Sequence, residues 1–177
     1  MRFIETSLAG AFVIEMDRHA DERGFFARSF CADEFAAAGL ASRFAQCNVS
    51  FNLKAGTLRG MHWQCAPHEE AKVVRCTRGA LFDVLVDLRP GSPTRHRWTG
   101  VELSAADHRQ VYIPPGFAHG FQTLEPDTEV FYLMSEPFAP ASARGLRWDD
   151  PTLAIDWPIA DPVVSGRDRE WPCLQAD

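Results

Sequence analysis

The sequence predicts an all-β fold of the sandwich or barrel type, with one short N-terminal helix and a loop-rich C-terminal tail. Between residues 57 and 134, short apolar or β-branched runs alternate with turn signals at intervals of about 8–12 residues. The clearest run spans residues 80–89, where Phe82, Val84 and Val86 alternate with Asp83 and Leu85, as in a strand with two different faces.

Ten segments are strand candidates, and one is a helix candidate. Residues 33–40 combine an acidic first turn, three alanines and a Gly39 stop signal, which predicts a short helix. From Pro137 onward, Pro, Asp and Trp predominate, so the tail is expected to wrap the barrel as loops and short turns. The strand candidates are residues 11–16, 24–30, 71–77, 80–89, 96–103, 109–113 and 129–134, and the segments near Asn48, Arg59 and His119.

Length and composition predict a single domain over residues 1–177. The 177 residues can bury a sizeable core but are too few for a cofactor domain plus a substrate domain. The formal net charge of −6 excludes the overall basic field that a nucleic-acid binder uses. No apolar run is long enough to cross a membrane, and Arg2 and Glu5 interrupt the stretch where a signal peptide would be apolar.

The five cysteines are odd in number and widely spaced, with no CxxC pair to suggest a zinc or redox site. They are therefore expected to be reduced thiols. Together with the missing signal peptide, they predict a cytoplasmic protein.

Arg59 and His62 lie on one predicted strand, in the block GTLRGMHWQ, with Gly60 between them. In an ideal strand, residues three apart point to opposite faces. Either a bulge or bend at Gly60 turns both toward one pocket, or Arg59 serves a neighbouring subunit across an interface. Taken alone, His62 is more often an ordinary core or surface histidine than a catalytic one.

Three further side chains could do chemistry, although each is weak evidence by itself. Lys72 lies on a predicted strand where its ammonium could be partly desolvated, but a lone strand lysine is usually solvated. His119 follows two prolines and lies between two glycines in PPGFAHGF. Tyr132 shares a strand face with Val130 and Met134 and is compatible with an ordinary core position.

These signals combine into a pattern that resembles the dTDP-4-dehydrorhamnose 3,5-epimerase family. The matching blocks run in order from Arg23 to Asp168 and cover nearly the whole chain. The resemblance implies a cupin-like jelly-roll β-barrel, usually a homodimer, that acts on a nucleotide-diphosphate sugar without a metal or other cofactor. The blocks are RGFF, QxNxS, LRGMHWQ, DVLVDLRPGSPT, YIPPGFAHGF, WDDP and IDWP, together with Lys72 and Tyr132.

The resemblance also implies a role for each candidate residue. His62 resembles the general base, Tyr132 the proton donor and Lys72 the residue that stabilises the enolate, while Asp168 resembles the aspartate that pairs with the histidine. Asp83 either lines the same cavity or is an ordinary strand aspartate. The residues that resemble ligands of the nucleotide diphosphate and sugar are Arg23, Gln46, Asn48, Arg59 and His119.

Three departures from the family pattern predict that selectivity for thymidine is relaxed or replaced. Phe138 stands where the family often has a tyrosine that stacks on the base, so the hydroxyl is missing. Arg28 stands where a glutamate is common on the nucleotide side. The stretch NVSFNLKAG is one residue longer than the commonest family version.

Three other functions remain as alternatives. A metal-dependent cupin would need a second histidine two residues after His62, where this chain has Gln64, although His68, Glu69, Glu70 and His119 could be assembled into a site. A non-catalytic sugar-binding cupin would not require His62, Lys72 and Tyr132 together. An epimerase that inverts only one carbon, or a keto-sugar isomerase, would use the same chemistry with a different outcome.

Overall fold

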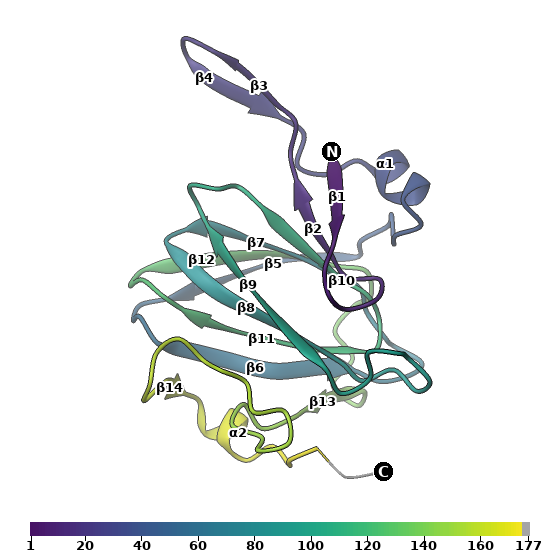
Figure 1. The fold of residues 1–177 in the computed structure, drawn as a ribbon, viewed down its shortest axis with the longest axis vertical. Coiled ribbons are helices and arrows are strands. Elements are labelled where there is room, and N and C mark those ends of the chain that lie inside the picture. The colour runs from purple at the N-terminus through teal and green to yellow at the C-terminus, as the bar shows by residue number, and fades with distance from the viewer. Residues whose placement is uncertain (175–177) are drawn as a thin grey trace.

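Two sheets face each other and enclose the main core in the computed structural model, which describes residues 1–174 (Figure 1). The order of the first sheet is β1 (Arg2–Glu5), β2 (Phe12–Glu15), β10 (Gln110–Ile113), β7 (Lys72–Arg78), β12 (Thr128–Met134) and β5 (Gln46–Asn52). The order of the second is β13 (Ala143–Gly145), β6 (Thr57–Gln64), β11 (Phe117–Thr123), β8 (Ala80–Asp87) and β9 (Trp98–Ser104), and β14 (Val163–Val164) also pairs with β6.

The chain order of the strands identifies the architecture. From β5 to β8 successive strands alternate between the two sheets, and β10, β11 and β12 alternate in the same way. All pairs within the barrel are antiparallel; the exception in the second sheet is the short parallel β14–β6 pair of the tail. This is the connectivity of a jelly roll, so the predicted all-β, cupin-like fold is confirmed.

All ten strand candidates are strands, and four further short strands were not predicted. These four are β1, the tail strands β13 and β14, and β3 (Arg18–Asp21), which forms a hairpin with β4 (Gly24–Ala27). Strand β3 has the sequence RHAD and is exposed at every position, so it lacks the apolar alternation that marks a half-buried strand. In Figure 1 this hairpin projects away from the barrel.

The predicted helix is α1 (Ala32–Ala37), which begins one residue earlier than expected and ends before Gly39. Gly39 has φ +74°, and the Leu40 N–H bonds the Phe35 carbonyl, so the left-handed glycine ends the helix as predicted. Phe35 is the buried residue of the helix, and its ring makes edge contacts with the rings of Phe3 and Phe30. Burial of such a ring contributes about 1.5–3 kcal/mol and fixes the helix against the first sheet.

The predicted two-faced pattern of β8 explains how the tail is attached. Leu81 and Leu85 point into the core between the sheets, whereas Val84 and Val86 pack with Leu153 of the tail on the outer face. In Figure 1 the tail lies along the β6 side of the barrel. It contains a short helix that was not predicted, α2 (Gly166–Arg169), which is thereby placed against β6.

A bulge in β6 brings Arg59 and His62 to the same face. His119 of β11 pairs with His62 and Phe121 pairs with Arg59, so two residues of β6, Gly60 and Met61, oppose the single Gly120 of β11. Gly60 has φ +142°, and a Cβ there would lie 2.5 Å from the Cα of Gly120. The bend therefore requires glycine at position 60, and of the two alternatives for Arg59 and His62 the structure has the first, a bulge at Gly60.

No helix among residues 1–174 is long and apolar enough to cross a membrane.

Candidate active site

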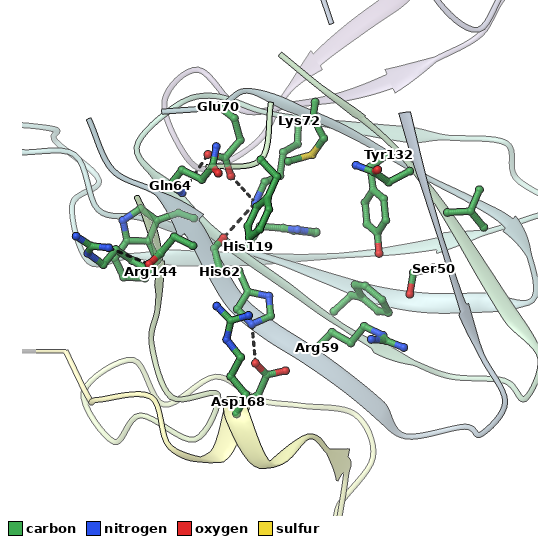
Figure 2. A pocket seen from close by; sticks show the side chains of 18 of the residues that line it. Ser50, Arg59, His62, Gln64, Glu70, Lys72, His119, Tyr132, Arg144 and Asp168 are labelled. Atoms are coloured by element: carbon green, nitrogen blue, oxygen red, sulfur yellow. Dashed lines mark hydrogen bonds and ion pairs between the residues drawn. The ribbon is translucent and has the colours of Figure 1, made fainter. Parts of the chain in front are cut away.

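A pocket of about 510 Å³ opens between the two sheets (Figure 2). Its walls are supplied by β5, β6, β7, β11 and β12, with α2 and residues near 138–144 at its edge. Eight predicted site residues line it: Asn48, Arg59, His62, Lys72, His119, Tyr132, Phe138 and Asp168. The barrel and the tail thus bring together residues that are far apart in the sequence.

His62 and Asp168 form a hydrogen-bonded pair at the boundary between the barrel and the tail. His62 Nε2 lies 2.6 Å from Asp168 Oδ1, and Trp171 Nε1 donates to the same oxygen at 3.3 Å. The His62 side chain is 41% exposed, whereas that of Asp168 is only 7% exposed. With Nε2 engaged, Nδ1 is the ring nitrogen that remains for a ligand.

The environment keeps Asp168 ionised. Burial by itself would raise the pKa of this carboxyl, but hydrogen bonding and charge from His62, with further hydrogen bonds from Ser165 and the Gly60 backbone, lower it below the usual range. Ser165 also caps α2 by accepting from the Asp168 N–H at 3.1 Å. An ionised Asp168 fixes the tautomer of His62 and stabilises the imidazolium that forms when His62 takes a proton.

Tyr132 enters the pocket from the opposite sheet. It lies on β12 and His62 lies on β6, and Figure 2 shows the phenol directed into the cavity near Ser50. Burial raises the pKa of Tyr132, although a hydrogen bond with Ser50 and the charge of Arg59 oppose this shift. The hydroxyl therefore keeps its proton at neutral pH and can act as a proton donor.

Lys72 lies at the start of β7 with its ammonium almost completely buried. Lys72 Nζ is 3.0 Å from Glu70 Oε1 and donates to the His62 carbonyl at 3.1 Å. The second Glu70 oxygen accepts from the Gln64 N–H at 3.0 Å. The ammonium is therefore held at the pocket wall between a carboxylate and the backbone of His62.

His119 and Arg59 occupy the inner part of the pocket. His119 Nε2 lies 2.7 Å from Asp83 Oδ1, and both side chains are buried. Asp83 does not line the pocket but lies behind His119, and its Oδ2 has no hydrogen-bond partner within residues 1–174. Arg59 Nε donates to Asn52 Oδ1 at 2.8 Å, and Arg59 lines the pocket of its own chain, which agrees with the first of the two alternatives given for this residue.

Arg23 and Gln46 lie outside the pocket of this chain. Arg23 is on the projecting hairpin, 82% exposed, and paired with Asp21. Gln46 is on β5, where its Oε1 accepts from the Phe138 N–H at 2.7 Å, so it holds the loop that carries Phe138. Arg28, one of the three departures, forms an ion pair with Glu34 rather than reaching this pocket.

Five pocket residues with hydroxyl, amide or charged side chains were not among the predicted site residues: Ser50, Gln64, Glu70, Arg144 and Arg167. Glu70 had a usable signal, because residues two apart on an extended chain point to the same side and Lys72 is two residues away. Arg144 and Arg167 had none, because both belong to the tail. Glu70 pairs with Lys72, and no group of three His, Cys, Asp or Glu side chains in residues 1–174 could hold a metal ion.

Comparison with known proteins shows full-length similarity to one family. A family model described as dTDP-4-dehydrorhamnose 3,5-epimerase matches residues 5–176. The chain is 45% identical to the protein of that name from Methanothermobacter thermautotrophicus, over 98% of this chain and 95% of the relative. It is 41% identical to a dTDP-4-dehydrorhamnose 3-epimerase from Streptomyces niveus, over 96% of this chain and 82% of the relative.

Among solved structures, the dTDP-4-dehydrorhamnose 3,5-epimerase of Bacillus anthracis, with TDP and PPi bound, is similar along its whole length. The TM-score is 0.94, with 42% sequence identity over 98% of this chain and 99% of that chain.

Proposed function

The chain belongs to the dTDP-4-dehydrorhamnose 3,5-epimerase family, and we propose that it inverts carbon 3, carbon 5 or both in a dTDP-linked 4-keto-6-deoxy sugar. The observation that carries this proposal is the arrangement of one pocket: His62, paired with Asp168 of the tail, enters from the second sheet, and Tyr132 enters from the first. A base and an acid on opposite sides of a sugar ring are what inversion of a carbon requires.

The 4-keto group makes the hydrogens on carbons 3 and 5 acidic. His62 Nδ1 takes a proton from one of these carbons, and the charge of Asp168 stabilises the resulting imidazolium. The electron pair moves to the carbonyl oxygen, where the Lys72 ammonium stabilises the negative charge. Tyr132 then returns a proton to the same carbon from the other face, which inverts the centre.

The remaining pocket residues are proposed to bind the nucleotide sugar. The guanidinium of Arg59 and the imidazole of His119 suit the oxygens of a diphosphate or sugar, and Asn48 adds an amide on β5. Phe138, which lines the pocket and is 60% exposed, provides a ring face for the nucleotide base. Gln46 contributes indirectly by holding the backbone of Phe138.

The same proposal includes a single domain over residues 1–177, a cytoplasmic location and a homodimer. The hairpin supports the dimer, because it carries Arg23 away from its own pocket and exposes Phe25 and Phe26. We propose that Arg23 reaches the partner's pocket instead. A monomeric mass by light scattering at working concentration, with full activity, would contradict the dimer.

Incubation of the chain with dTDP-4-keto-6-deoxy sugars in heavy water tests the function. Each inverted carbon takes up one deuterium from the solvent, so mass spectrometry counts the centres. One label indicates a single-centre enzyme, as the name of the Streptomyces niveus relative describes, and two labels indicate inversion of both carbons. Absence of both label and product would contradict the proposal and favour a binding protein.

The mechanism is proposed to need no metal ion, because Lys72 supplies the positive charge beside the carbonyl oxygen. Exhaustive chelation should leave the rate unchanged. Loss of turnover that a single divalent ion restores would support the metal-dependent alternative.

A further inference from the structure

Glu70 is a buried carboxylate beside the pocket to which the mechanism above gives no part. We infer that Glu70 is a positioning residue for Lys72, which it holds charged and aimed at the oxygen where the enolate charge develops. This inference rests on the proposed epimerase function and extends it to a residue that does not itself touch the reacting carbons.

The contacts of Lys72 define what Glu70 does. An ammonium has three N–H donors, and the contacts to Glu70 Oε1 and the His62 carbonyl use two of them. Both acceptors belong to the protein. Because the three N–H bonds of an ammonium have a fixed geometry, these two contacts set the direction of the third N–H. Because Lys72 also lines the pocket, that donor serves the substrate oxygen.

Burial makes the carboxylate necessary. The side chains of Lys72 and Glu70 are only 8% and 3% exposed. A lysine taken out of water without an anion loses much of its preference for the charged form. Glu70 supplies that anion at 3.0 Å, and a charged ammonium stabilises an enolate better than a neutral amine.

Glu70 is itself fixed by the neighbouring strand and loops. Its Oε2 accepts from the Gln64 N–H, while the Gln64 side chain donates to the His68 carbonyl at 2.9 Å and accepts from the Ala139 N–H at 2.6 Å. Both carboxylate oxygens thus face donors. A glutamine at position 70 has nearly the same shape, but its amide nitrogen would point a donor at either Lys72 or the Gln64 N–H.

The test compares Glu70→Gln and Glu70→Asp with Glu69→Gln, which changes the exposed neighbouring carboxylate. Glu70→Gln should lower kcat by about 10- to 100-fold, the usual cost of removing a partner that orients a reacting group. KM should change little, because Lys72 acts on the charge that develops during reaction. Glu70→Asp, which keeps the charge, should recover part of kcat, and Glu69→Gln should match the unmodified chain.

The pH profile provides a readout that a purely structural role would not move. Glu70→Gln removes the anion that lies 3.0 Å from a buried ammonium, so the alkaline limb of kcat/KM should move to lower pH in this variant. Glu70→Gln leaves the other ionisable groups of the pocket in place, so this movement reports on Lys72. These groups are Arg59, His62, His119, Tyr132, Arg144, Arg167 and Asp168.

A double-mutant cycle keeps the inference testable if Glu70→Gln folds poorly. Lys72→Met leaves the buried Glu70 charge unpaired, whereas the double variant Glu70→Gln/Lys72→Met has no buried charge at either position. If Glu70 acts through Lys72, adding Glu70→Gln to Lys72→Met should cause no further loss of kcat. A further loss of tenfold or more in a folded double variant that still binds dTDP would overturn the inference.

The failure of this inference is distinguishable from the failure of the proposed function. An unmodified chain that neither labels nor inverts any dTDP-4-keto sugar contradicts the function. An unmodified chain that is active, with Glu70→Gln equal to it in kcat and in the alkaline limb, contradicts only the role of Glu70.

Discussion

Two histidine–aspartate pairs contribute to the same pocket. Their hydrogen bonds have similar lengths, but the pairs differ in exposure and in the part of the chain that supplies the aspartate. The Nε2–Oδ1 distance is 2.6 Å for His62–Asp168 and 2.7 Å for His119–Asp83. The His62 side chain is 41% exposed and its aspartate comes from the tail, whereas the His119 side chain is 6% exposed and its aspartate lies within the barrel.

The difference shows that pairing with a carboxylate does not by itself make a base. Asp168 has additional donors in Trp171, Ser165 and the Gly60 backbone, while Asp83 Oδ2 has no partner within the described part of the chain. The more exposed His62 has room for a substrate, whereas the buried His119 is bonded to Asp83 and lies with its ring centroid 6.4 Å from that of Phe121. We therefore assign proton transfer to the first pair and binding to the second.

The largest expected effect comes from removing the base. His62→Asn should abolish both product formation and deuterium exchange, because general base catalysis contributes roughly 10²–10⁴-fold to the rate. Mass spectrometry of substrate recovered from heavy water measures the exchange. Exchange at the rate of the unmodified chain would move the role of base elsewhere, with His119 as the first candidate.

Tyr132→Phe separates the two halves of the reaction. The enolate still forms at His62 and is reprotonated from the same face, so deuterium should enter recovered substrate while inverted product falls by about 10²-fold. The ratio of exchange to inversion is the measurement. Inverted sugar formed at an undiminished rate would show that protons reach the second face by another route.

Asp168→Asn removes the charge that distinguishes the catalytic pair. Loss of imidazolium stabilisation should lower kcat by about 10- to 100-fold, while Asp83→Asn should leave kcat nearly unchanged and act on KM. Steady-state kinetics of the two variants make a matched comparison. Equal losses of kcat would remove the distinction between the pairs.

The Asp168 carboxyl should also affect how the stability of the protein depends on pH. Because folding lowers the pKa of Asp168 below its ordinary value of 3.8, its contribution is fully present above that pH and is lost as the pH falls through the lower folded pKa. Asp168→Asn should therefore reduce the urea midpoint at pH 7 more than at pH 2. A midpoint shift that is independent of pH would contradict a charge-based role.

His119→Asn is expected to weaken binding rather than chemistry. A lost hydrogen bond to a charged oxygen costs about 1.5–3 kcal/mol, which corresponds to at least about a tenfold rise in KM at similar kcat. Calorimetric titration with dTDP measures the same loss without turnover. A fall in kcat at constant KM would place His119 in the proton-transfer step.

The smallest expected effect concerns the selectivity of the pocket for the nucleotide base. The missing hydroxyl at Phe138 predicts weak discrimination among thymidine, uridine, cytidine and guanosine diphosphates. Phe138→Tyr should raise the preference for thymidine by about two- to tenfold, the value of one net hydrogen bond. Strong thymidine preference in the unmodified chain would show that this departure has no consequence.

Local sequence patterns predicted most of the barrel and of the chemistry. The alternation of residues 80–89 predicted the two faces of β8. The acidic first turn, the alanines and Gly39 predicted the bounds of α1 to within a few residues. The resemblance of ordered blocks pointed to His62, Lys72, Tyr132 and the distant Asp168, all of which line one pocket. Elements with no apolar alternation, such as β3, gave no signal.

The sequence by itself thus determined most of the strands and the set of candidate reactive groups, and it offered the bend at Gly60 as one of two alternatives, because periodicity and residue chemistry are local properties. Only the tertiary structure decided which groups meet. It placed Arg59 in its own pocket and Arg23 outside it, paired Lys72 with Glu70, and put Gln46 on the Phe138 backbone. The register between strands and the path of the tail, which are long-range properties, set these contacts and separate the half-exposed His62 from the buried His119.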